Sequence, residues 1–251
     1  MNIITITKEN LDQEHICCAI SNNKDIQVIS KKSWLAARLD EGLVFKKGDV
    51  RGKCFIEYIP AEKAWVPIDA AGYMYIDCLW VSGQFKGHGY SSLLLDECIS
   101  DSKAKGKQGI VVLSSSRKMS FLSDPSFFRH KGFILSDMAK PYFELLYLSF
   151  DKNAEKPRFS LQESVVSGSR GFELYYTHQC PFTAKYVPVL EKLAREKNLP
   201  FKSILIDSTE QARTVPIPFT TYSLFWNGKF VTHEILSENK FIKLLKTLGY
   251  E

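Results

Sequence analysis

Several features that would define the class of this protein are missing from its sequence. No apolar run approaches the roughly 20 residues that a membrane-spanning helix needs, so no membrane partner is expected. Residues 1–10 lack a basic stretch followed by a long apolar core, so no secretory signal is expected and the expected compartment is the cytoplasm. The six cysteines include no C-x-x-C pair and no zinc-ligand spacing, so no metal is expected. Without an export signal, their thiols are expected to be reduced.

Charge of one sign is also scarce. The net charge is only +5, and basic residues occur as short pairs such as Lys31-Lys32 and Lys46-Lys47 rather than as a dense stripe. Nucleic acid is therefore not an expected partner, whereas a modest positive field equally suits a phosphate-bearing small molecule. With 45% hydrophobic and 24% charged residues, the composition is globular and excludes disorder, collagen and coiled coil as the main architecture.

A polar stretch divides the chain. Residues 151–170 contain Pro157, Gly168 and several serines, and they show no sustained hydrophobic period. Such a composition is typical of a linker between domains. The sequence therefore predicts a first domain over residues 1–150, a linker over 151–170 and a smaller second domain over 171–251.

The first segment mixes strand-like and helix-like patterns, which predicts an α/β (α+β) domain. A long strand in the middle leads into a glycine turn and then into a helix. The expected strands are 2–6, 43–46, 53–59, 64–68, 73–81, 109–114 and 143–150, and the expected helices are 11–20, 33–39, 91–103 and 126–131.

The glycine turn, Gln84-Phe85-Lys86-Gly87-His88-Gly89, carries the strongest chemical signal of this segment. It precedes a helix that begins near Tyr90, and a helix start offers unpaired N–H groups and the positive end of the helix dipole. Glycines let the backbone close around an anion, so we expect a pyrophosphate cradle rather than a plain tight turn. The turn matches neither a Walker loop nor a G-x-G-x-x-G fingerprint.

The turn and its surroundings resemble the GNAT superfamily of acetyl-CoA-dependent N-acetyltransferases. The loop pattern [QR]-x-x-G-x-[GA] of that superfamily falls on Gln84, Gly87 and Gly89. Residues 127–133, FFRHKGF, are similar to its F-Y-x-x-x-G-F segment. The resemblance covers roughly residues 40–150 and implies a GNAT-like mixed sheet flanked by helices, with acetyl-CoA as co-substrate.

The resemblance also implies which residues hold the coenzyme. The strand around Leu79 would bond the pantetheine arm through its backbone, and one N–H there would stabilise the oxyanion. The amides from Phe85 to Tyr90 would hold the pyrophosphate. The implied coenzyme-binding residues are Leu79, Trp80, Val81, Gln84, Phe85, Lys86, Gly87, His88, Gly89 and Tyr90.

The acid–base residues depart from the family pattern. Phe128 stands where the family often has a tyrosine that protonates the leaving thiolate, which leaves Tyr75 and Tyr142 as candidate donors. Two-residue alternation places Asp77 on the strand face of Leu79 and Val81, where its carboxylate would accept the ammonium proton. A structural ion pair is the alternative role of Asp77. By the same alternation, Cys78 is expected in the core on the other face.

The second segment also carries a motif. A strand at 172–176 leads into Thr177-His178-Gln179-Cys180-Pro181-Phe182-Thr183 and an amphipathic helix to about residue 197. A strand at 201–206, two strands at 222–226 and 229–233 around Asn227-Gly228, and a helix at 238–248 are expected to follow.

This order resembles a thioredoxin-like domain, and C-P-x-T resembles the monothiol variant of its motif. The resemblance implies a cis peptide before Pro218 or Pro216. The helix dipole is expected to lower the pKa of Cys180, a candidate redox thiol. The pairing of the two halves resembles the YoaP-like two-domain acetyltransferases over nearly the full chain.

Three functions remain to be separated. The first is acetyl transfer from acetyl-CoA to an amine, with a small molecule as the expected acceptor. The second is a coenzyme A-binding redox sensor that uses Cys180 without acyl turnover, and the absence of tyrosine at Phe128 favours it. The third is a monothiol oxidoreductase. For the second domain, a structural or substrate-shaping role is favoured over thiol chemistry, and homo-oligomerisation is left open.

Overall fold

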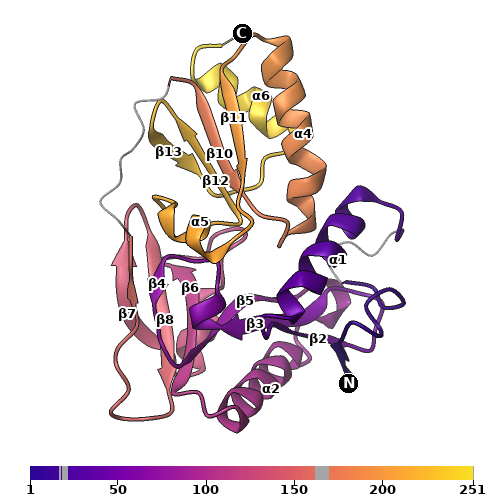
Figure 1. Cartoon of the computed structure of the whole chain (residues 1–251), viewed down its shortest axis with the longest axis vertical. Helices are drawn as coiled ribbons and strands as arrows, with labels where there is room; N and C mark the ends of the chain where they lie inside the picture. Colours follow the sequence, from indigo (N-terminus) through magenta and orange to yellow (C-terminus); the bar gives the residue numbers. More distant parts are fainter. Residues whose placement is uncertain (17, 19–21, 162–169, 251) are drawn as a thin grey trace.

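A computed structural model describes residues 1–16, 18, 22–161 and 170–250 of the chain. The first half is built on a seven-stranded sheet in the order β1-β2-β3-β5-β6-β8-β7 (Figure 1). Neighbouring strands are antiparallel except β5 and β6, which are parallel. The bounds are β1 Ile3–Ile6, β2 Val44–Gly48, β3 Cys54–Pro60, β5 Tyr73–Val81, β6 Gly109–Ser115, β7 Ile134–Ala139 and β8 Phe143–Ser149.

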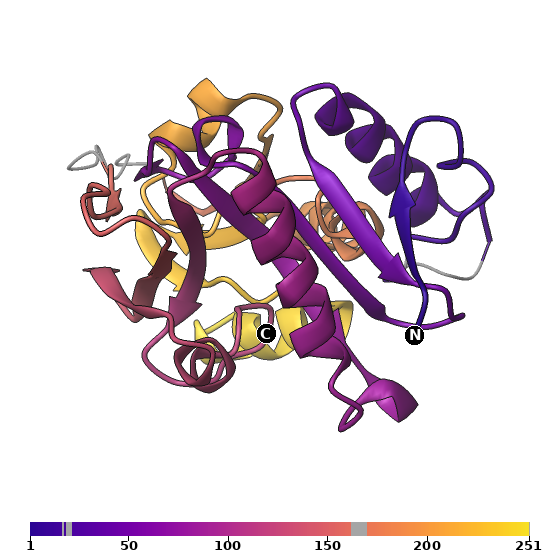
Figure 2. The same cartoon turned by 90° about the horizontal axis from the view of Figure 1, so that it is seen from below.

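Helices cover both faces of this sheet because its strands are apolar on both sides. Helix α1 (Ile26–Leu39) buries Val28, Trp34 and Leu35 against one face. Helix α2 (Tyr90–Ala104) lies across the other face, where it buries Leu94, Leu95 and Cys98 (Figure 2). A short helix, α3 (Pro125–His130), begins at an Asp124 cap and places Phe128 in the α2-side core.

The second half forms a four-stranded sheet in the order β11-β10-β12-β13. Strands β10 and β11 are parallel, and β12 and β13 form the expected hairpin around Asn227-Gly228, whose φ angles are 46° and 74°. Helices α4 and α6 enclose a core around Phe172, Leu190 and Phe241. The bounds are β10 Phe172–Tyr176, α4 Pro181–Glu196, β11 Phe201–Leu205, α5 Thr209–Thr214, β12 Tyr222–Trp226, β13 Lys229–Thr232 and α6 Glu238–Thr247.

The two halves share a core. Ile217 and Phe225 of the second half are buried in the α1-side cluster of the first. Helices α1 and α4 pack against each other, and the Thr220 hydroxyl donates to the backbone carbonyl of Trp65. The second sheet therefore covers the α1 side of the first sheet, as Figure 1 shows.

Several sequence-based expectations for local structure are wrong. Residues 11–16 and 18 form turns and an isolated bridge rather than a helix, and residues 17, 19 and 20 lie outside the described part. The expected strand at 64–68 is reduced to β4 (Ile68–Asp69), because the preceding chain turns through a 3₁₀ helix, Ala61–Lys63. In the described residues the cis peptide bond precedes Pro141, and the expected cis bond before Pro216 or Pro218 is not found.

Other elements are longer than expected or were not expected. Helix α1 begins at Ile26 rather than at the expected Ser33. The sequence pattern did not indicate these first turns because Ile26 and Ile29 are exposed and do not continue the buried apolar stripe. Strand β7 and helix α5 have no counterpart among the expected elements. Within 151–161, strand β9 (Arg158–Phe159) pairs with β4, and residues 162–169 lie outside the described part.

Candidate active site between the two halves

The central strands of the first sheet separate halfway along their length. Strand β5 pairs with β6 only from Tyr73–Gly109 to Ile76–Val112. Beyond this point β5 stays paired with β3, and β6 stays paired with β8. One backbone edge of β5 after Asp77 therefore faces no strand, and its N–H and C=O groups are available to an extended ligand.

A bulge in β5 lies at the point of separation. Glu57 of β3 is opposite Cys78, whereas the next residue, Tyr58, is opposite Ile76. Asp77 is therefore the extra residue of a β-bulge, which re-aims the side chains that follow it.

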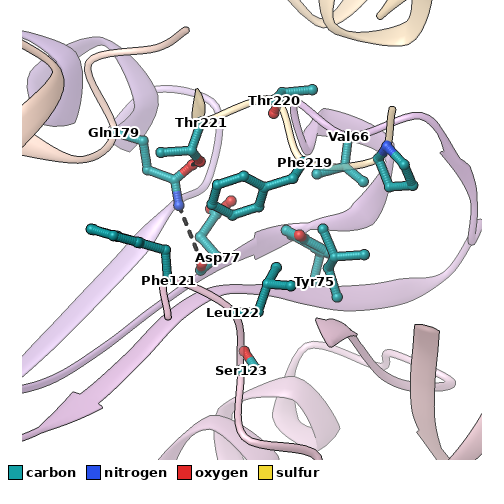
Figure 3. A pocket seen from close by; sticks show the side chains of 12 residues that line it. Val66, Tyr75, Asp77, Phe121, Leu122, Ser123, Gln179, Phe219, Thr220 and Thr221 are labelled. Carbon is teal, nitrogen blue, oxygen red and sulfur yellow. Dashed lines mark hydrogen bonds between the residues drawn. The ribbon is translucent and has the colours of Figure 1, made fainter. Parts of the chain in front are cut away.

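The bulge overturns the expected strand faces. Asp77 and Tyr75 line one pocket on the α1 side of the sheet (Figure 3). Cys78 packs against the core of that same side, and Leu79 and Val81 pack on the α2 side. The expectations that Asp77 shares a face with Leu79 and Val81, and that Cys78 faces away from Asp77, are therefore wrong. Simple alternation fails here because one residue has been inserted into the pairing.

The glycine turn presents a row of free backbone donors. Gly87 and Gly89 have φ angles of 81° and 75°, which L-residues with side chains rarely adopt. Gly89 caps α2, and no side chain bonds to the exposed N–H groups there. Within the described residues, the N–H groups of residues 87–92 have no protein acceptor, and the turn is anchored where the Phe85 ring packs on Gly52.

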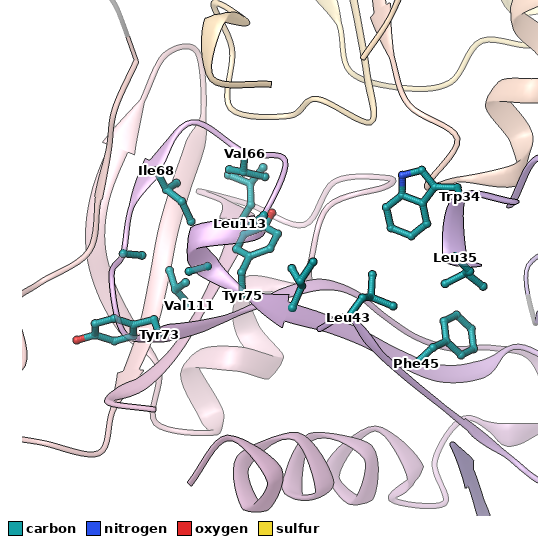
Figure 4. Packing of buried hydrophobic residues seen from close by; sticks show 14 of the residues in the cluster. Trp34, Leu35, Leu43, Phe45, Val66, Ile68, Tyr73, Tyr75, Val111 and Leu113 are labelled. Atoms are coloured by element: carbon teal, nitrogen blue, oxygen red, sulfur yellow. The ribbon is translucent and has the colours of Figure 1, made fainter. Parts of the chain in front are cut away.

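The pocket at the separated strands is built from both halves of the chain. It holds about 310 Å³ of empty space, part of which is open to solvent. Tyr75 joins this pocket to the buried α1-side cluster (Figure 4). The lining residues are Val66, Tyr75, Asp77, Leu113, Phe121, Leu122, Ser123, Gln179, Pro218, Phe219, Thr220 and Thr221.

Asp77 is a buried carboxyl group with an unusual ionisation. Its Oδ2 atom is buried and has no hydrogen-bond partner in the structure. Burial raises the pKa of Asp77 to about 8, the negative charge of Glu57 adds to this, and the positive charges of Arg38 and Lys31 oppose it. Asp77 therefore exchanges its proton close to neutral pH, which is where a general base is most effective.

Glu57 is the charged neighbour of Asp77 on strand β3. Its Oε2 atom lies 2.5 Å from Nζ of Lys31, and both side chains are almost fully buried. Burial raises the pKa of Glu57, while Lys31 and the nearby Gln179 side chain lower it. Removing either member of this pair would leave a buried charge without a partner.

The motif of the second half docks onto this part of β5. Nε2 of Gln179 donates to the backbone carbonyl of Asp77 at 3.2 Å, and Oε1 of Gln179 accepts from the Thr221 hydroxyl at 2.8 Å. Farther along, the Lys53 ammonium lies 4.8 Å from the Trp80 ring and 5.9 Å from the Phe182 ring. Residues 179–182 therefore run beside residues 77–80, and the two motifs form one site.

Cys180 is a protonated thiol in this site rather than an activated one. It caps α4, but burial raises its pKa to about 11 and outweighs the backbone hydrogen bond and the positive charges of Lys31 and Lys53. The expected decrease of the Cys180 pKa is therefore wrong. Thr183 occupies the second cysteine position, where its buried hydroxyl lies 2.6 Å from the Thr177 carbonyl and 2.7 Å from the Cys180 carbonyl.

Tyr142 makes a different contact between the halves. Nε2 of His233 is 2.8 Å from the carbonyl of Ser120, which can only accept, so this nitrogen carries the hydrogen. Nδ1 of His233 therefore accepts from the Tyr142 hydroxyl at 2.6 Å. Of the two candidate tyrosines, Tyr75 lines the pocket with Asp77, whereas Tyr142 holds the halves together.

One relative matches the whole chain. A protein from Bacillus subtilis (strain 168) named "Uncharacterized N-acetyltransferase YoaP" is 48% identical over 251 residues, 99% of this chain and 100% of the relative. The chain belongs to the YoaP-like family. A family model described as YoaP-like also matches residues 200–243.

Solved structures resemble this YoaP-like protein more distantly. PaiA N-acetyltransferase from Thermoplasma acidophilum, in complex with coenzyme A, is 15% identical with a TM-score of 0.41, covering 60% of this chain and 100% of that one. A ribosomal-protein-alanine N-acetyltransferase from Brucella melitensis is 16% identical with a TM-score of 0.41, covering 59% and 97%. A GNAT family acetyltransferase from the same organism, in complex with acetyl-CoA, is 18% identical with a TM-score of 0.39, covering 62% and 91%.

Two residues of the YoaP-like site were missed by sequence reasoning. Glu57 is the one charged residue in the apolar run CFIEYIP, and this interruption is a signal that could have identified it. Gln179 belongs to the C-P-x-T motif region, but no local pattern indicates that it reaches β5. Among the described residues, no group of three or more His, Cys, Asp or Glu side chains can hold a metal ion, and no helix suits a membrane crossing.

Proposed function

We propose that this protein transfers the acetyl group of acetyl-CoA to an amine. The observation that carries the proposal is the alignment of two features of one strand–turn–helix unit. Strand β5 has an open backbone edge beside Asp77, and the turn that follows it exposes the N–H groups of residues 87–92. Together they suit a long ligand with a phosphate-rich end and a reactive end.

The coenzyme would lie along this unit. The pyrophosphate would accept hydrogen bonds from the amides of the turn and the first turn of α2, where the helix dipole favours negative charge. The pantetheine arm would bond the backbone edge of Leu79, Trp80 and Val81. The remaining proposed contacts are Gln84, Phe85, Lys86, Gly87, His88, Gly89 and Tyr90.

Asp77 would act as the base in the pocket. An amine arrives as an ammonium ion and must lose a proton before its lone pair attacks the thioester carbonyl. The Asp77 carboxylate would take that proton, and a backbone N–H near Leu79 would stabilise the oxyanion that forms. Collapse of this intermediate breaks the carbon–sulfur bond and expels the coenzyme A thiolate. Loss of the second nitrogen proton to water then leaves the neutral amide.

Tyr75 is the proposed donor of the proton to that thiolate. Phe128 cannot serve, because it is a phenyl ring packed in the α2-side core against Phe127 and Phe133. Burial and the nearby Asp77 raise the pKa of Tyr75 well above its ordinary value, so its hydroxyl keeps its proton until the thiolate forms. Tyr142 is the less favoured candidate, since its hydroxyl bonds to His233.

The two halves would correspond to domains over residues 1–150 and 171–251, with 151–170 joining them. In this arrangement the second domain supplies one wall of the acceptor pocket through Gln179 and residues 218–221. The cytoplasm, where acetyl-CoA and free amines are available, is the proposed compartment.

A coenzyme-binding redox sensor is the second candidate, and the raised pKa of the partly exposed Cys180 argues against it. Burial holds the pKa of this thiol near 11, so little thiolate exists at neutral pH. The proposed transferase does not need Cys180 as a thiolate. Cys180→Ser is therefore expected to keep acyl transfer.

The test combines coenzyme binding with a matched pair of glycine variants. Gly89 and Gly106 both have positive φ, 75° and 66°, and both have open space around an added Cβ, but they lie at opposite ends of α2. Calorimetry with coenzyme A should show roughly 100-fold weaker binding for Gly89→Asp, which places a carboxylate in the proposed cradle, and unchanged binding for Gly106→Asp. Equal binding by the two variants would rule out the cradle.

Turnover is measured as coenzyme A released from acetyl-CoA with an amine panel, separated by chromatography. Release that depends on amine and persists in Cys180→Ser would support the transferase. Tight coenzyme binding with no release for any amine would favour the sensor.

A further inference from the structure

The residues that line the Asp77 pocket indicate the chemistry of the acceptor. We infer that the acceptor is a small amine with a single positive charge and an apolar body, carrying neither a carboxylate nor a second charge near the amine. This inference rests on the proposed function, because it assigns the pocket to the acceptor of that reaction. Figure 3 shows the side chains that carry it.

The charged groups of the pocket are of one sign. Asp77 is the one acidic lining residue, and no lysine, arginine or histidine is among the lining residues. The two cations whose charges act on Asp77 are already bonded: Lys31 lies 2.5 Å from Glu57, and Arg38 donates to Glu41 and to the Lys63 carbonyl. A carboxylate on the acceptor would therefore enter the pocket without a positive partner.

Three of the uncharged polar residues already use a donor within the protein. Thr220 donates to the Trp65 carbonyl, Thr221 donates to Gln179, and Gln179 donates to the Asp77 carbonyl. Among the lining residues, the buried side-chain atom without a hydrogen-bond partner is Oδ2 of Asp77. A ligand that brings hydrogens to this oxygen fits the pocket, and an ammonium group carries three.

The remaining walls are apolar and come from both halves. Val66, Leu113 and Leu122 face the pocket from the first half, and Pro218 and Phe219 face it from the second. The 310 Å³ of empty space between these walls includes space that is open to solvent, so only a small ligand can be enclosed there. A short hydrocarbon fits these walls, whereas a second charge would be desolvated there without compensation.

The experiment compares three acceptors that share one straight chain. Pentylamine has one cation, cadaverine adds a second ammonium at the far end, and norleucine adds a carboxylate beside the amine. With saturating acetyl-CoA, kcat/KM for coenzyme A release should be at least about tenfold higher for pentylamine than for either of the others. Norleucine or cadaverine turning over as well as pentylamine would overturn the inference.

Binding measurements separate this failure from failure of the proposed function. Acetyl-CoA binding is measured first by calorimetry, and pentylamine and norleucine are then titrated into the coenzyme A-loaded protein. No acetyl-CoA binding would refute the proposed function itself. Acetyl-CoA binding without pentylamine binding or turnover would refute only the assignment of the acceptor.

A charge placed in the pocket should reverse part of the preference. Leu122 lines the pocket, whereas Leu135 on β7 is 37% exposed and does not line it. Leu122→Lys should raise the norleucine-to-pentylamine ratio of kcat/KM by about tenfold, and Leu135→Lys should leave it unchanged. An unchanged ratio in a folded Leu122→Lys protein would contradict the inference, and the wild-type comparison stands if that variant does not fold.

Discussion

The side-chain amide of Gln179 donates to the backbone carbonyl of Asp77 at 3.2 Å, although the two residues are 102 positions apart in the chain. This contact joins the motif of the second half to the bulge of the first. It places Gln179, the residue before the C-P-x-T run, beside the proposed base. Gln179 thus lines the proposed acceptor pocket.

Asp77→Asn tests the base. The amide keeps the size of the side chain but cannot take a proton, so kcat should decrease by about 10²-fold or more. Acetyl-CoA binding should be unaffected, because the proposed coenzyme contacts lie farther along the unit. A kcat within a factor of about three of wild type would remove Asp77 from the mechanism.

The pH dependence of kcat provides a second test. Burial and Glu57 raise the pKa of Asp77 to about 8, against the opposing charges of Arg38 and Lys31. Because the base acts only when deprotonated, kcat should rise with pH through a midpoint near this value, provided that the pKa changes little when the substrates bind.

Glu57→Gln is the matched variant for this profile. It removes a negative charge beside Asp77 and leaves Lys31 unpaired, so the pKa of Asp77 should fall and the midpoint should move to lower pH. Tyr75, Cys78 and Cys180 also face this cluster but are uncharged near neutral pH, because burial raises each of their pKa values. A midpoint that stays in place would show that another group controls the rate.

The contribution of Asp77 to stability should decrease with rising pH, whereas its contribution to activity should increase. A carboxyl whose pKa is raised in the folded state stabilises the protein at low pH, and this contribution is lost as pH rises from its ordinary value of 3.8 to about 8. The increase in Tm caused by Asp77→Asn should therefore be larger at pH 9 than at pH 5. A pH-independent difference in Tm would indicate that Asp77 is already ionised in the folded protein.

The two tyrosines are distinguished by paired substitutions. Tyr75→Phe should lower kcat, since it removes the proposed proton donor from the pocket. Tyr142→Phe should leave kcat nearly unchanged and cost about 1 kcal/mol of stability, because it removes one hydrogen bond to His233. If Tyr142→Phe is the variant that loses kcat, the assignment of the donor reverses.

Cys180 is expected to react slowly with alkylating agents. Burial raises its pKa from 9.0 to about 11, so its thiolate fraction near neutral pH is about 100-fold lower than that of an ordinary thiol. Mass spectrometry after iodoacetamide treatment, with Cys180→Ser to assign the modified site, measures the rate. Alkylation of Cys180 as fast as that of a free thiol would revive the sensor hypothesis.

Much of the architecture could be predicted from local patterns. Strands β5, β10 and β12 match their expected ranges, 73–81, 172–176 and 222–226, because each is a short run of apolar, β-branched or aromatic residues with clear ends. The Asn227-Gly228 hairpin and the resemblance to the YoaP-like acetyltransferases are also confirmed. Strand β7 was missed because Ile134, Leu135 and Met138 are exposed and show no buried face.

The candidate site could be predicted only in part. Local sequence indicated a strand, a glycine turn and a helix, because propensity, turn chemistry and capping act between residues close in the chain. The bulge at Asp77, the burial that raises the Cys180 pKa and the contact between Gln179 and Asp77 all required the tertiary structure. Register, desolvation and contacts between the halves depend on which distant segments pack together, and local sequence patterns do not predict that packing.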